Sequence, residues 1–421
     1  MPHRTDILWA THPEPDVSVR SSTVVAMRIL HTSDWHIGRT FHGVDLLGDQ
    51  ARALTAIAEL VAARAVDVVV VPGDVYDRSI PSSDAVAVCN AGLEAIRDAG
   101  AIIVATSGNH DSPVRLGAGA AFAAKGGLHL ITKVSELDRP VILDDDHGPV
   151  AFYGIPYLEP EITRAELGVP KARSHQEILD AAMSRVRADA EARGGRTVLL
   201  AHAFVVGGEA TGSERSISVG GVETVSASAF DGVDYVALGH LHSPQTVAEH
   251  VRYSGSPLPY SFGERSHRKA VWLVDLGETG RTSVERVDLP VVRGLSQLSG
   301  TLEDLLADPA HTGAEDHYVA AELSDAVRPL DAMRRLQKRF PHAVHVVWQR
   351  PDPMPGTTYR EKVHGRSDVE VACAFLSDVR SEPSRREARW IEQALREADR
   401  AGGDRAPAAA GAEIGAAEVP A

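Results

Sequence analysis

Residues 66–77 read VDVVVVPGDVYD, and this stretch decides the fold. Its continuous run of β-branched residues predicts a strand buried on both faces, which is typical of a parallel sheet. Further strands are expected over residues 28–32, 101–105, 197–201 and 233–238. Apolar residues at helical spacing over 46–65 and 84–99 predict helices between strands. The pattern indicates an α/β domain that extends to about residue 290.

Each of these strands is followed by side chains of the kinds that bind metal ions. The sequence after them reads DWH, GDVYD, GNHD, H and GHLH, in chain order. Carboxyl ends of parallel strands gather ligands at one edge of a sheet. In D-x-H and H-x-H the two outer residues point to the same side of an extended chain. The candidate metal ligands are Asp34, His36, Asp74, Asn109, His202, His240 and His242.

This set of ligands indicates the chemistry. Imidazole, carboxylate and amide groups suit divalent ions such as Mn²⁺, Fe²⁺ or Zn²⁺. Seven ligands are too many for one tetrahedral ion, but they fit two ions that share a bridging carboxylate. Such a pair activates water and stabilises charge on a phosphoryl group, so phosphoester hydrolysis is the predicted reaction class.

Other polar residues are interpreted as structural. A lone histidine such as His202 is more often structural than a ligand, and only its place among the other strand ends favours metal binding. The histidines outside the five strand ends are expected to be structural; they include His31, His42, His129 and His267. The run Asp144–Asp146 is expected to be a solvated turn and not a third metal site.

Composition narrows the possible classes of protein. The chain has 421 residues, 43% hydrophobic and 24% charged, which excludes wholesale disorder. Its net charge of −15 argues against a generally basic surface but allows a local basic face. Cys89 and Cys373 form no C-x-x-C pair, so we expect a reducing, cytoplasmic setting. No apolar run reaches the ~20 residues of a membrane span, and the N-terminal residues lack the apolar segment of a signal peptide, so we expect no secretory signal.

The pattern of predicted elements and the local charge of the sequence change after residue 290. A helix over 300–307, a strand over 317–322, a helix over 328–340 and a strand over 343–348 predict a β-α-β appendage. Residues 326–366 contain nine Lys or Arg against three acids, a local excess of 9 − 3 = +6. Residues 368–399 are expected to be mostly helical. Residues 1–26 are interpreted as a disordered extension, or as an artefact of start-codon choice with Met27 the true start, and residues 401–421 as a disordered tail.

The order of motifs D-x-H, GDxxD, GNHD, H and GHxH resembles the calcineurin-like metallophosphoesterase superfamily. Residues 27–51, 233–246 and 252–265 resemble the SbcD family of nuclease subunits, and the similarity covers roughly residues 27–400. The resemblance implies a four-layer αββα sandwich with a small β-α-β capping domain and C-terminal helices. It implies a nuclease domain over 27–290, a DNA-capping domain over 291–366 and a partner-binding helical segment over 367–400.

The resemblance also implies roles for individual residues. Asp34, His36 and His242 would hold one ion, Asn109, His202 and His240 the other, and Asp74 would bridge them. His110 would act at the scissile phosphate, either protonating the leaving oxygen or stabilising charge. Asp111 would fix the orientation of His110, and Asp77 would support the ligands from outside. The capping domain would contact DNA through Arg334, Arg335, Lys338 and Arg339.

The implied activity is Mn²⁺-dependent cleavage of DNA, as a 3′–5′ exonuclease on duplex ends and an endonuclease on hairpins. It would serve DNA repair, replication and recombination in the cytoplasm, at the nucleoid. The implied assembly is a homodimer of this chain with an SbcC-type ATPase, forming a heterotetramer. Phe375, Trp390 and Ile391 would anchor that partner, although a self-packed helical hairpin explains them equally well. The chain has no G-x-x-x-x-G-K-[ST] motif, so any ATP-dependent control requires another polypeptide.

Two other functions are compatible with parts of the sequence. The first is a small-molecule or cyclic-nucleotide phosphodiesterase, which the basic appendage and the apolar C-terminal helices disfavour because a small substrate needs neither. The second is a scaffold without catalytic activity that binds DNA ends, which the complete ligand set disfavours. Cleavage of a chromogenic phosphodiester without cleavage of DNA would favour the first. Undiminished cleavage by His110→Ala or Asp74→Asn would favour the second.

Overall fold

The computed structural model describes residues 26–209, 214, 224–349, 365–379 and 382–402. The chain divides into two compact units. The first comprises the described residues up to Gln297 together with Gly313–Ala320 and Phe340–His345, and the second comprises the remainder. The predicted extension and tail lie almost wholly outside the described residues. Among the described residues, no helix has the length and apolar character needed to cross a membrane.

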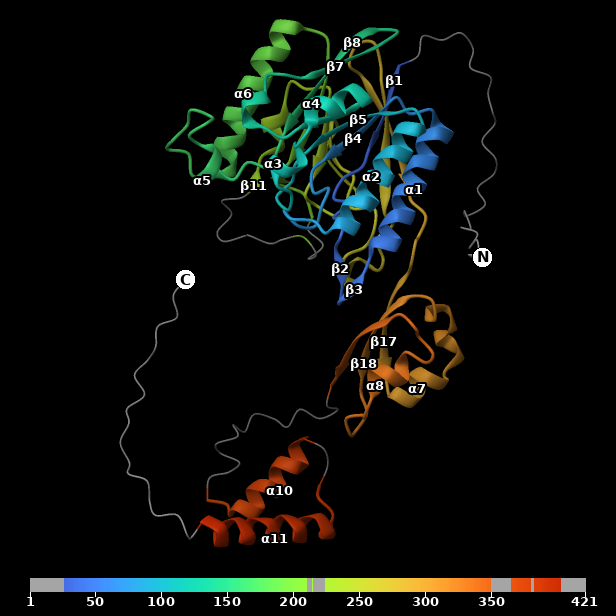
Figure 1. Cartoon of the computed structure of the whole chain (residues 1–421), viewed down its shortest axis with the longest axis vertical. Coiled ribbons are helices and arrows are strands. Elements are labelled where there is room, and N and C mark those ends of the chain that lie inside the picture. The colour runs from blue at the N-terminus through green and yellow to red at the C-terminus, as the bar shows by residue number, and fades with distance from the viewer. Residues whose placement is uncertain (1–25, 210–213, 215–223, 350–364, 380–381, 403–421) are drawn as a thin grey trace. The chain divides into compact units, whose positions relative to one another are not determined.

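Two six-stranded sheets form the centre of the first unit (Figure 1). The first sheet has the order β16 (Thr282–Asp288), β15 (Ala270–Leu276), β1 (Met27–His31), β4 (Val68–Pro72), β5 (Ile102–Thr106), β6 (Leu128–Ile131). The second has the order β13 (Gln245–Ala248), β14 (Val251–Tyr253), β12 (Tyr235–Gly239), β9 (Arg196–His202), β8 (Gly148–Ile155), β7 (Val141–Asp145). In the first sheet β1, β4 and β5 run parallel, and in the second β9 and β12 do. The five expected strands are therefore present, each in a parallel ladder.

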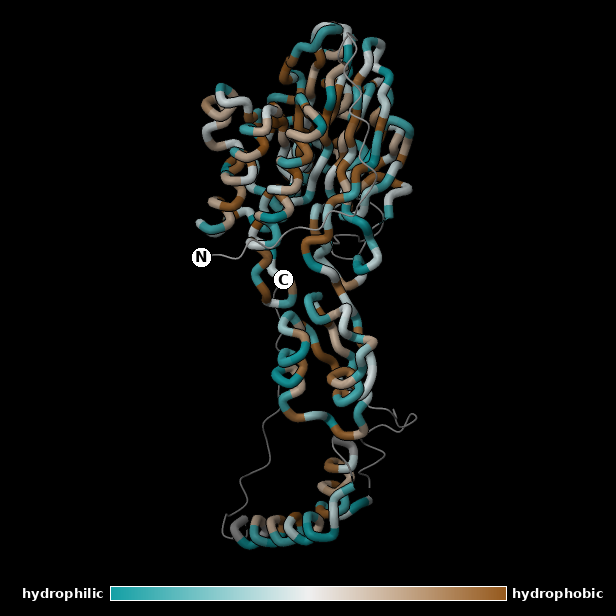
Figure 2. Tube along the Cα trace, turned by 90° about the vertical axis from the view of Figure 1, so that its right-hand side faces the viewer, coloured by the Kyte–Doolittle hydropathy of each residue, from teal (hydrophilic) through white to brown (hydrophobic). Residues whose placement is uncertain are grey.

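Helices cover the outer faces of both sheets, which gives four layers. The longer helices are α1 (Leu47–Arg64), α2 (Ser83–Asp98) and α6 (His175–Arg193). One cluster packs Leu54 and Ile57 of α1 against the first sheet, and another packs Ile178 and Met183 of α6 against the second. A third cluster fills the space between the sheets. The predicted αββα sandwich is confirmed, and Figure 2 shows hydrophobic residues running through its strands.

Short elements complete the first unit. They are β2 (Thr40–Phe41), β3 (Val44–Asp45), α3 (Pro113–Leu116), α4 (Ala120–Ala123), α5 (Pro160–Thr163), β10 (Phe204–Val205) and β11 (Thr224–Val225), with 3₁₀ turns at Ala124–Gly126, Val134–Glu136, Ala227–Phe230 and Phe262–Glu264. Asp144 and Asp145 end strand β7, and Asp145 pairs with buried Arg196 at 2.5 Å. The prediction of a solvated turn over Asp144–Asp146 was wrong for Asp145, because Arg196, which is distant in the sequence, neutralises the charge of its carboxylate. His31 is structural as expected: it bridges the sheets, accepting from the Tyr235 hydroxyl at 3.0 Å and donating to the Leu238 carbonyl at 3.1 Å.

The region after residue 290 differs in detail from the expectation. Its sheet has three strands, β17 (Leu295–Gly300), β18 (Tyr318–Leu323) and β19 (Ala343–Trp348), with α7 (Leu302–Ala307) and a 3₁₀ turn at Pro309–Ala314. Strand β17 was not predicted. Helix α8 covers only Ala332–Leu336 and not 328–340, because Pro329 precedes it and Asp331 adopts a positive φ of 51°. Helices α10 (Asp368–Val379) and α11 (Arg385–Gly402) pack against each other as a hairpin.

Candidate metal centre

The predicted ligands meet where the parallel strands β1, β4, β5, β9 and β12 end. Several of them have strained backbones: φ is 52° at Asp34, 44° at His36, 48° at Asp74 and 106° at His240. Residues other than glycine seldom adopt such angles, and clusters of them are typical of functional sites. The strain turns each side chain back across the strand end into one small volume.

One group of ligands comes from β1 and β12. Asp34, His36 and His242 offer ligand atoms that all lie within 4.8 Å of one another. The Nε2 atoms of His36 and His242 face each other at 3.0 Å. The carboxylate of Asp34 also accepts a hydrogen bond from the backbone N–H of His240 at 2.9 Å, which ties the two strand ends together. All three side chains are buried.

A second group lies beside the first. Asn109 Oδ1 lies 2.8 Å from His202 Nε2 and 3.3 Å from His240 Nδ1. His202 Nδ1 donates to the carbonyl of Pro72 at 2.9 Å, which leaves Nε2 with its lone pair as a ligand atom. Asp74 lies between the groups, since its Oδ2 is 3.5 Å from His36 Nε2 and 3.6 Å from His202 Nε2. The structure thus brings all seven predicted ligands together.

Burial sets the electrostatics of the site. It raises the pKa of Asp34 to about 8 and raises the pKa of Asp74, where the charge of Asp34 adds to the effect. Burial lowers the pKa of His36, His202 and His242 well below the usual value, and lowers that of His240 to about 4. The histidines are therefore neutral, as metal ligands must be, and two buried carboxylates lie side by side. Divalent cations fit this donor set.

Two glycines make the close packing of the strand ends possible. Gly73 has φ of 95°, and a Cβ there would collide with the ring of His202. A Cβ on Gly108 would collide with the carboxylate of Asp74. Any side chain at either position would therefore displace a ligand.

His110 lies next to the ligands, with its ring at 4.6 Å from that of His36. Its Nδ1 donates to the carbonyl of Asp77 at 2.8 Å, and its Nε2 is 4.0 Å from Asp74 Oδ2. Asp111 was expected to orient His110, and this expectation was wrong. The carboxylate of Asp111 instead accepts from the backbone N–H groups of Val75, Tyr76 and Gly108 at 2.9–3.1 Å. Asp111 therefore holds the loop that carries Asp74, because three donors converge on it there.

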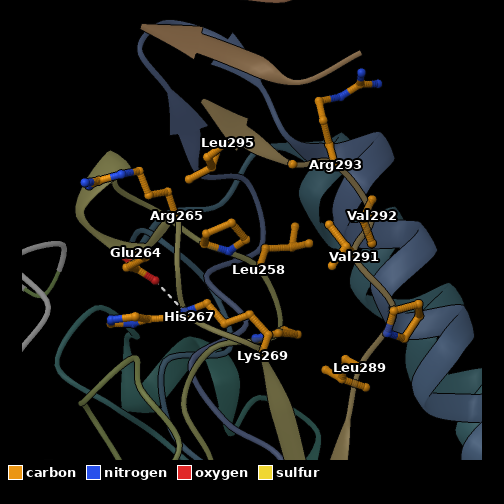
Figure 3. A pocket seen from close by; sticks show the side chains of 14 residues that line it. Leu258, Glu264, Arg265, His267, Lys269, Leu289, Val291, Val292, Arg293 and Leu295 are labelled. Carbon is orange, nitrogen blue, oxygen red and sulfur yellow. Dashed lines mark hydrogen bonds and ion pairs between the residues drawn. The ribbon is translucent and has the colours of Figure 1, made fainter. Parts of the chain in front are cut away.

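A buried ion pair behind the site holds the loop that carries His242. Lys269 Nζ donates to the His242 carbonyl at 2.8 Å, to Ser256 Oγ at 3.0 Å and to the carboxylate of Glu264. Figure 3 shows Glu264 and Lys269 joined at the wall of a small pocket of about 70 Å³. The side chains of Lys269 and Glu264 are 7% and 0% exposed. The ammonium thus fixes the backbone of His242, a candidate metal ligand.

A Lys269→Met variant is expected to lose about 3–5 kcal/mol of unfolding free energy, because it leaves the Glu264 carboxylate buried and unpaired. Urea unfolding in EDTA measures this. Adding Glu264→Gln should recover more than half of the loss, since the amide oxygen still accepts from Tyr260 N–H. Lys133→Met removes an exposed pair with Glu136 and serves as the control, with an expected change of less than about 1 kcal/mol. A loss no larger than in the control would contradict the assigned role.

The predicted DNA-binding residues lie on and after α8. Arg334 and Lys338 are exposed. Arg335 lies 3.7 Å from Glu303, and Arg339 donates to the Leu305 carbonyl at 3.0 Å. Arg350, Arg360 and Lys362, which contribute to the predicted basic stretch, lie outside the described residues. Arg334 and Lys338 are therefore the better candidates for binding an external anion, because Arg335 and Arg339 already contact Glu303 and the Leu305 carbonyl.

A family model for calcineurin-like phosphoesterases matches residues 27–244. The chain belongs to the calcineurin-like phosphoesterase family. A second model, SbcD_C, described as the type 5 capsule protein repressor C-terminal domain, matches residues 291–380. The chain is thus an SbcD-type member of the metallophosphoesterase superfamily. With the ligand groups described above, it is a dimetal phosphoester hydrolase that takes two divalent ions.

Two solved structures are similar to parts of this chain. The protein TT1561 of Thermus thermophilus is 14% identical, with a TM-score of 0.38; the match covers 62% of this chain and 99% of that chain. A dimetal phosphatase from Danio rerio, LOC 393393, is 14% identical, with a TM-score of 0.40; the match covers 63% of this chain and 97% of that chain.

Sequence reasoning missed several residues around the ligands. Lys269 and Glu264 were not considered, and neither was Tyr260, whose ring meets the rings of His36 and His242 at 5.4 and 5.6 Å. Arg39 was also missed, although it follows His36 by only three residues. The position of Arg39 three residues after His36 was a signal that could have identified it. Lys269, Glu264 and Tyr260 carry no local motif.

Proposed function

We propose that this chain is the nuclease subunit of a DNA-processing complex, a metal-dependent exonuclease and endonuclease that cleaves phosphodiesters at DNA ends and hairpins. The observation that carries the proposal is the combination, in one chain, of seven clustered candidate metal ligands with a C-terminal region that matches the SbcD_C model. A phosphoesterase acting on small molecules needs no such region.

The two ions are proposed to divide the ligands as follows. Asp34, His36 and His242 hold one ion, Asn109, His202 and His240 hold the other, and Asp74 bridges them. The position of Asp74 Oδ2, nearly equidistant from His36 and His202, supports the bridge. Mn²⁺ is the proposed metal because the resemblance to the SbcD family implies it; the mixed imidazole and oxygen ligands suit Mn²⁺, Fe²⁺ and Zn²⁺ alike. The bound ions supply an activated water and neutralise charge on the phosphoryl group.

Exposed cations on the second unit are proposed to contact the DNA backbone. A double variant, Arg334→Glu with Lys338→Glu, is expected to weaken DNA binding. It should also make the negative slope of log affinity against log salt less steep by about 2, one per lost phosphate contact. Fluorescence anisotropy with duplex DNA at several salt concentrations measures both. Lys171→Glu, at another exposed lysine, is the control. Unchanged affinity at low salt would contradict this surface assignment.

The C-terminal hairpin is proposed to bind an SbcC-type ATPase. Phe375 on α10 is 50% exposed and Trp390 on α11 is 56% exposed, which is unusual for such large apolar side chains. Helix α11 is otherwise mostly hydrophilic (Figure 2). A heterotetramer of two copies of each chain, located in the cytoplasm at the nucleoid, and a role in repair, replication and recombination complete the proposal.

The deciding experiment is a cleavage assay on linear duplex and hairpin DNA with Mn²⁺, Mg²⁺ or Zn²⁺, with and without the ATPase subunit. We expect 3′–5′ degradation of duplex ends and hairpin opening, strongest with Mn²⁺ and stimulated by ATP when the partner is present. Hydrolysis of bis(4-nitrophenyl) phosphate without any cleavage of DNA would instead indicate a small-molecule phosphodiesterase.

A further inference from the structure

Arg39 lies at the edge of the metal centre and is held there by an aromatic ring. Its backbone N–H donates to the carbonyl of His36 at 3.0 Å. Its guanidinium carbon lies 4.8 Å from the centre of the Tyr260 ring, the ring that also meets His36 and His242. The side chain is 18% exposed, so it can be reached from solvent. Stacking of this kind holds the planar guanidinium in one orientation.

Arg39 belongs to a small group of charged side chains. Asp77 Oδ1 is 3.5 Å from Arg39 Nη1, and Asp77 Oδ2 is 3.8 Å from Arg78 Nε. Both separations exceed the 2.7–3.2 Å of a direct N–H···O bond. Two guanidinium groups thus share one carboxylate through loose contacts. Together these three side chains carry a net positive charge, on a chain whose net charge is −15.

The side of His36 on which Arg39 lies identifies what it can bind. His36 Nε2 faces His242 and Asp74, at 3.0 and 3.5 Å, and is therefore the ligand atom. His36 Nδ1, on the other side of the ring, faces Asp77 at 3.6 Å. Arg39 contacts the same Asp77 oxygen as His36 Nδ1 does, so its guanidinium is associated with the side of His36 away from the ligand atom Nε2. It is placed to meet a group adjacent to the reacting phosphoryl group.

We infer that Arg39 binds a backbone phosphate next to the phosphodiester being cleaved, with Arg78 adding charge from the solvent side. This rests on the proposed function, because it requires a substrate with more than one phosphate. Arg39 is accordingly a specificity-determining residue that favours polynucleotides over isolated phosphodiesters. The competing explanation is that Arg39 only stabilises Asp77 and the loop around it.

The experiment compares the full-length wild type with Arg39→Gln and Arg39→Lys on duplex DNA and on bis(4-nitrophenyl) phosphate, which has a single phosphate. For Arg39→Gln we expect kcat/KM on DNA to fall about tenfold more than on the chromogenic ester, mainly through KM. The negative slope of log kcat/KM against log salt on DNA should become less steep by about 1. Arg39→Lys should keep that slope because it keeps the charge. Arg52→Gln, which removes an arginine paired with Asp49 at 2.6 Å, is the matched control.

The outcomes separate this inference from the proposed function. If wild type cleaves DNA but Arg39→Gln loses the same factor on both substrates with an unchanged salt slope, Arg39 is only structural and the inference is overturned. If wild type hydrolyses the ester and cleaves no DNA, the proposed function fails and the inference fails with it. A larger loss on DNA together with the reduced slope supports the inference.

Discussion

An Asp74→Asn variant is expected to hydrolyse phosphodiesters about 10³-fold more slowly than wild type and to bind fewer than two divalent ions. Asp74 Oδ1 accepts from the backbone N–H of His110 at 2.9 Å, so Oδ2 is the oxygen that faces both ligand groups. In the asparagine variant, the amide oxygen takes the place of Oδ1 and still accepts from the His110 N–H. The amide NH₂ takes the place of Oδ2, where it repels cations and cannot bridge them. The substitution therefore removes the bridge while the loop stays in place.

Metal content by mass spectrometry and titration calorimetry with Mn²⁺ measure the loss. Asp144→Asn is the matched control, since it neutralises an exposed aspartate on β7, away from the ligands. The melting temperature of the Asp74 variant in EDTA should not fall, because the substitution also relieves repulsion between two buried carboxylates. Two bound ions and full activity in Asp74→Asn would contradict the bridging role. A large fall in melting temperature would show that the loss is structural.

The sequence predicted the strand ends well for a physical reason. Asp34, Asp74 and His240 each lie within three residues of the end of a short apolar strand, so their positions depend on local sequence and on the parallel arrangement of the sheets. Parallel strands bring such positions to a common edge whatever the details of packing. The clustering of the seven candidate ligands could therefore be predicted without the structure.

What could not be predicted depends on contacts between distant parts of the chain. Tyr260 stacks under Arg39 although 221 residues separate them. Lys269 reaches the His242 carbonyl across 27 residues. The acceptor for His110 is a backbone carbonyl, that of Asp77, which no residue pattern signals. The nearby carboxylate of Asp111 looked like the orienting group in sequence but is occupied by backbone donors.

A His110→Asn variant is expected to lower kcat on DNA by about 10²–10⁴-fold while binding both ions normally. Since a carbonyl can only accept, His110 Nδ1 carries the hydrogen that bonds Asp77. In the neutral ring Nε2 is therefore bare, and it carries a proton only in the imidazolium form. If His110 acts as the general acid, it would deliver the Nε2 proton of the imidazolium to the leaving oxygen. His129→Asn, at a half-buried histidine on β6, is the control and should leave kcat unchanged.

The nature of the leaving group distinguishes proton donation from charge stabilisation by His110. Deoxyribose leaves as a strongly basic alkoxide and needs a proton, whereas 4-nitrophenolate leaves readily without one. If His110 is the donor, single-turnover rates of His110→Asn should fall at least about tenfold less on bis(4-nitrophenyl) phosphate than on DNA, with the salt dependence on DNA unchanged. That unchanged salt dependence separates the effect from the one expected for Arg39. Equal losses on the two substrates would mean that the imidazolium stabilises charge on the phosphoryl oxygens instead, because that charge develops with either leaving group.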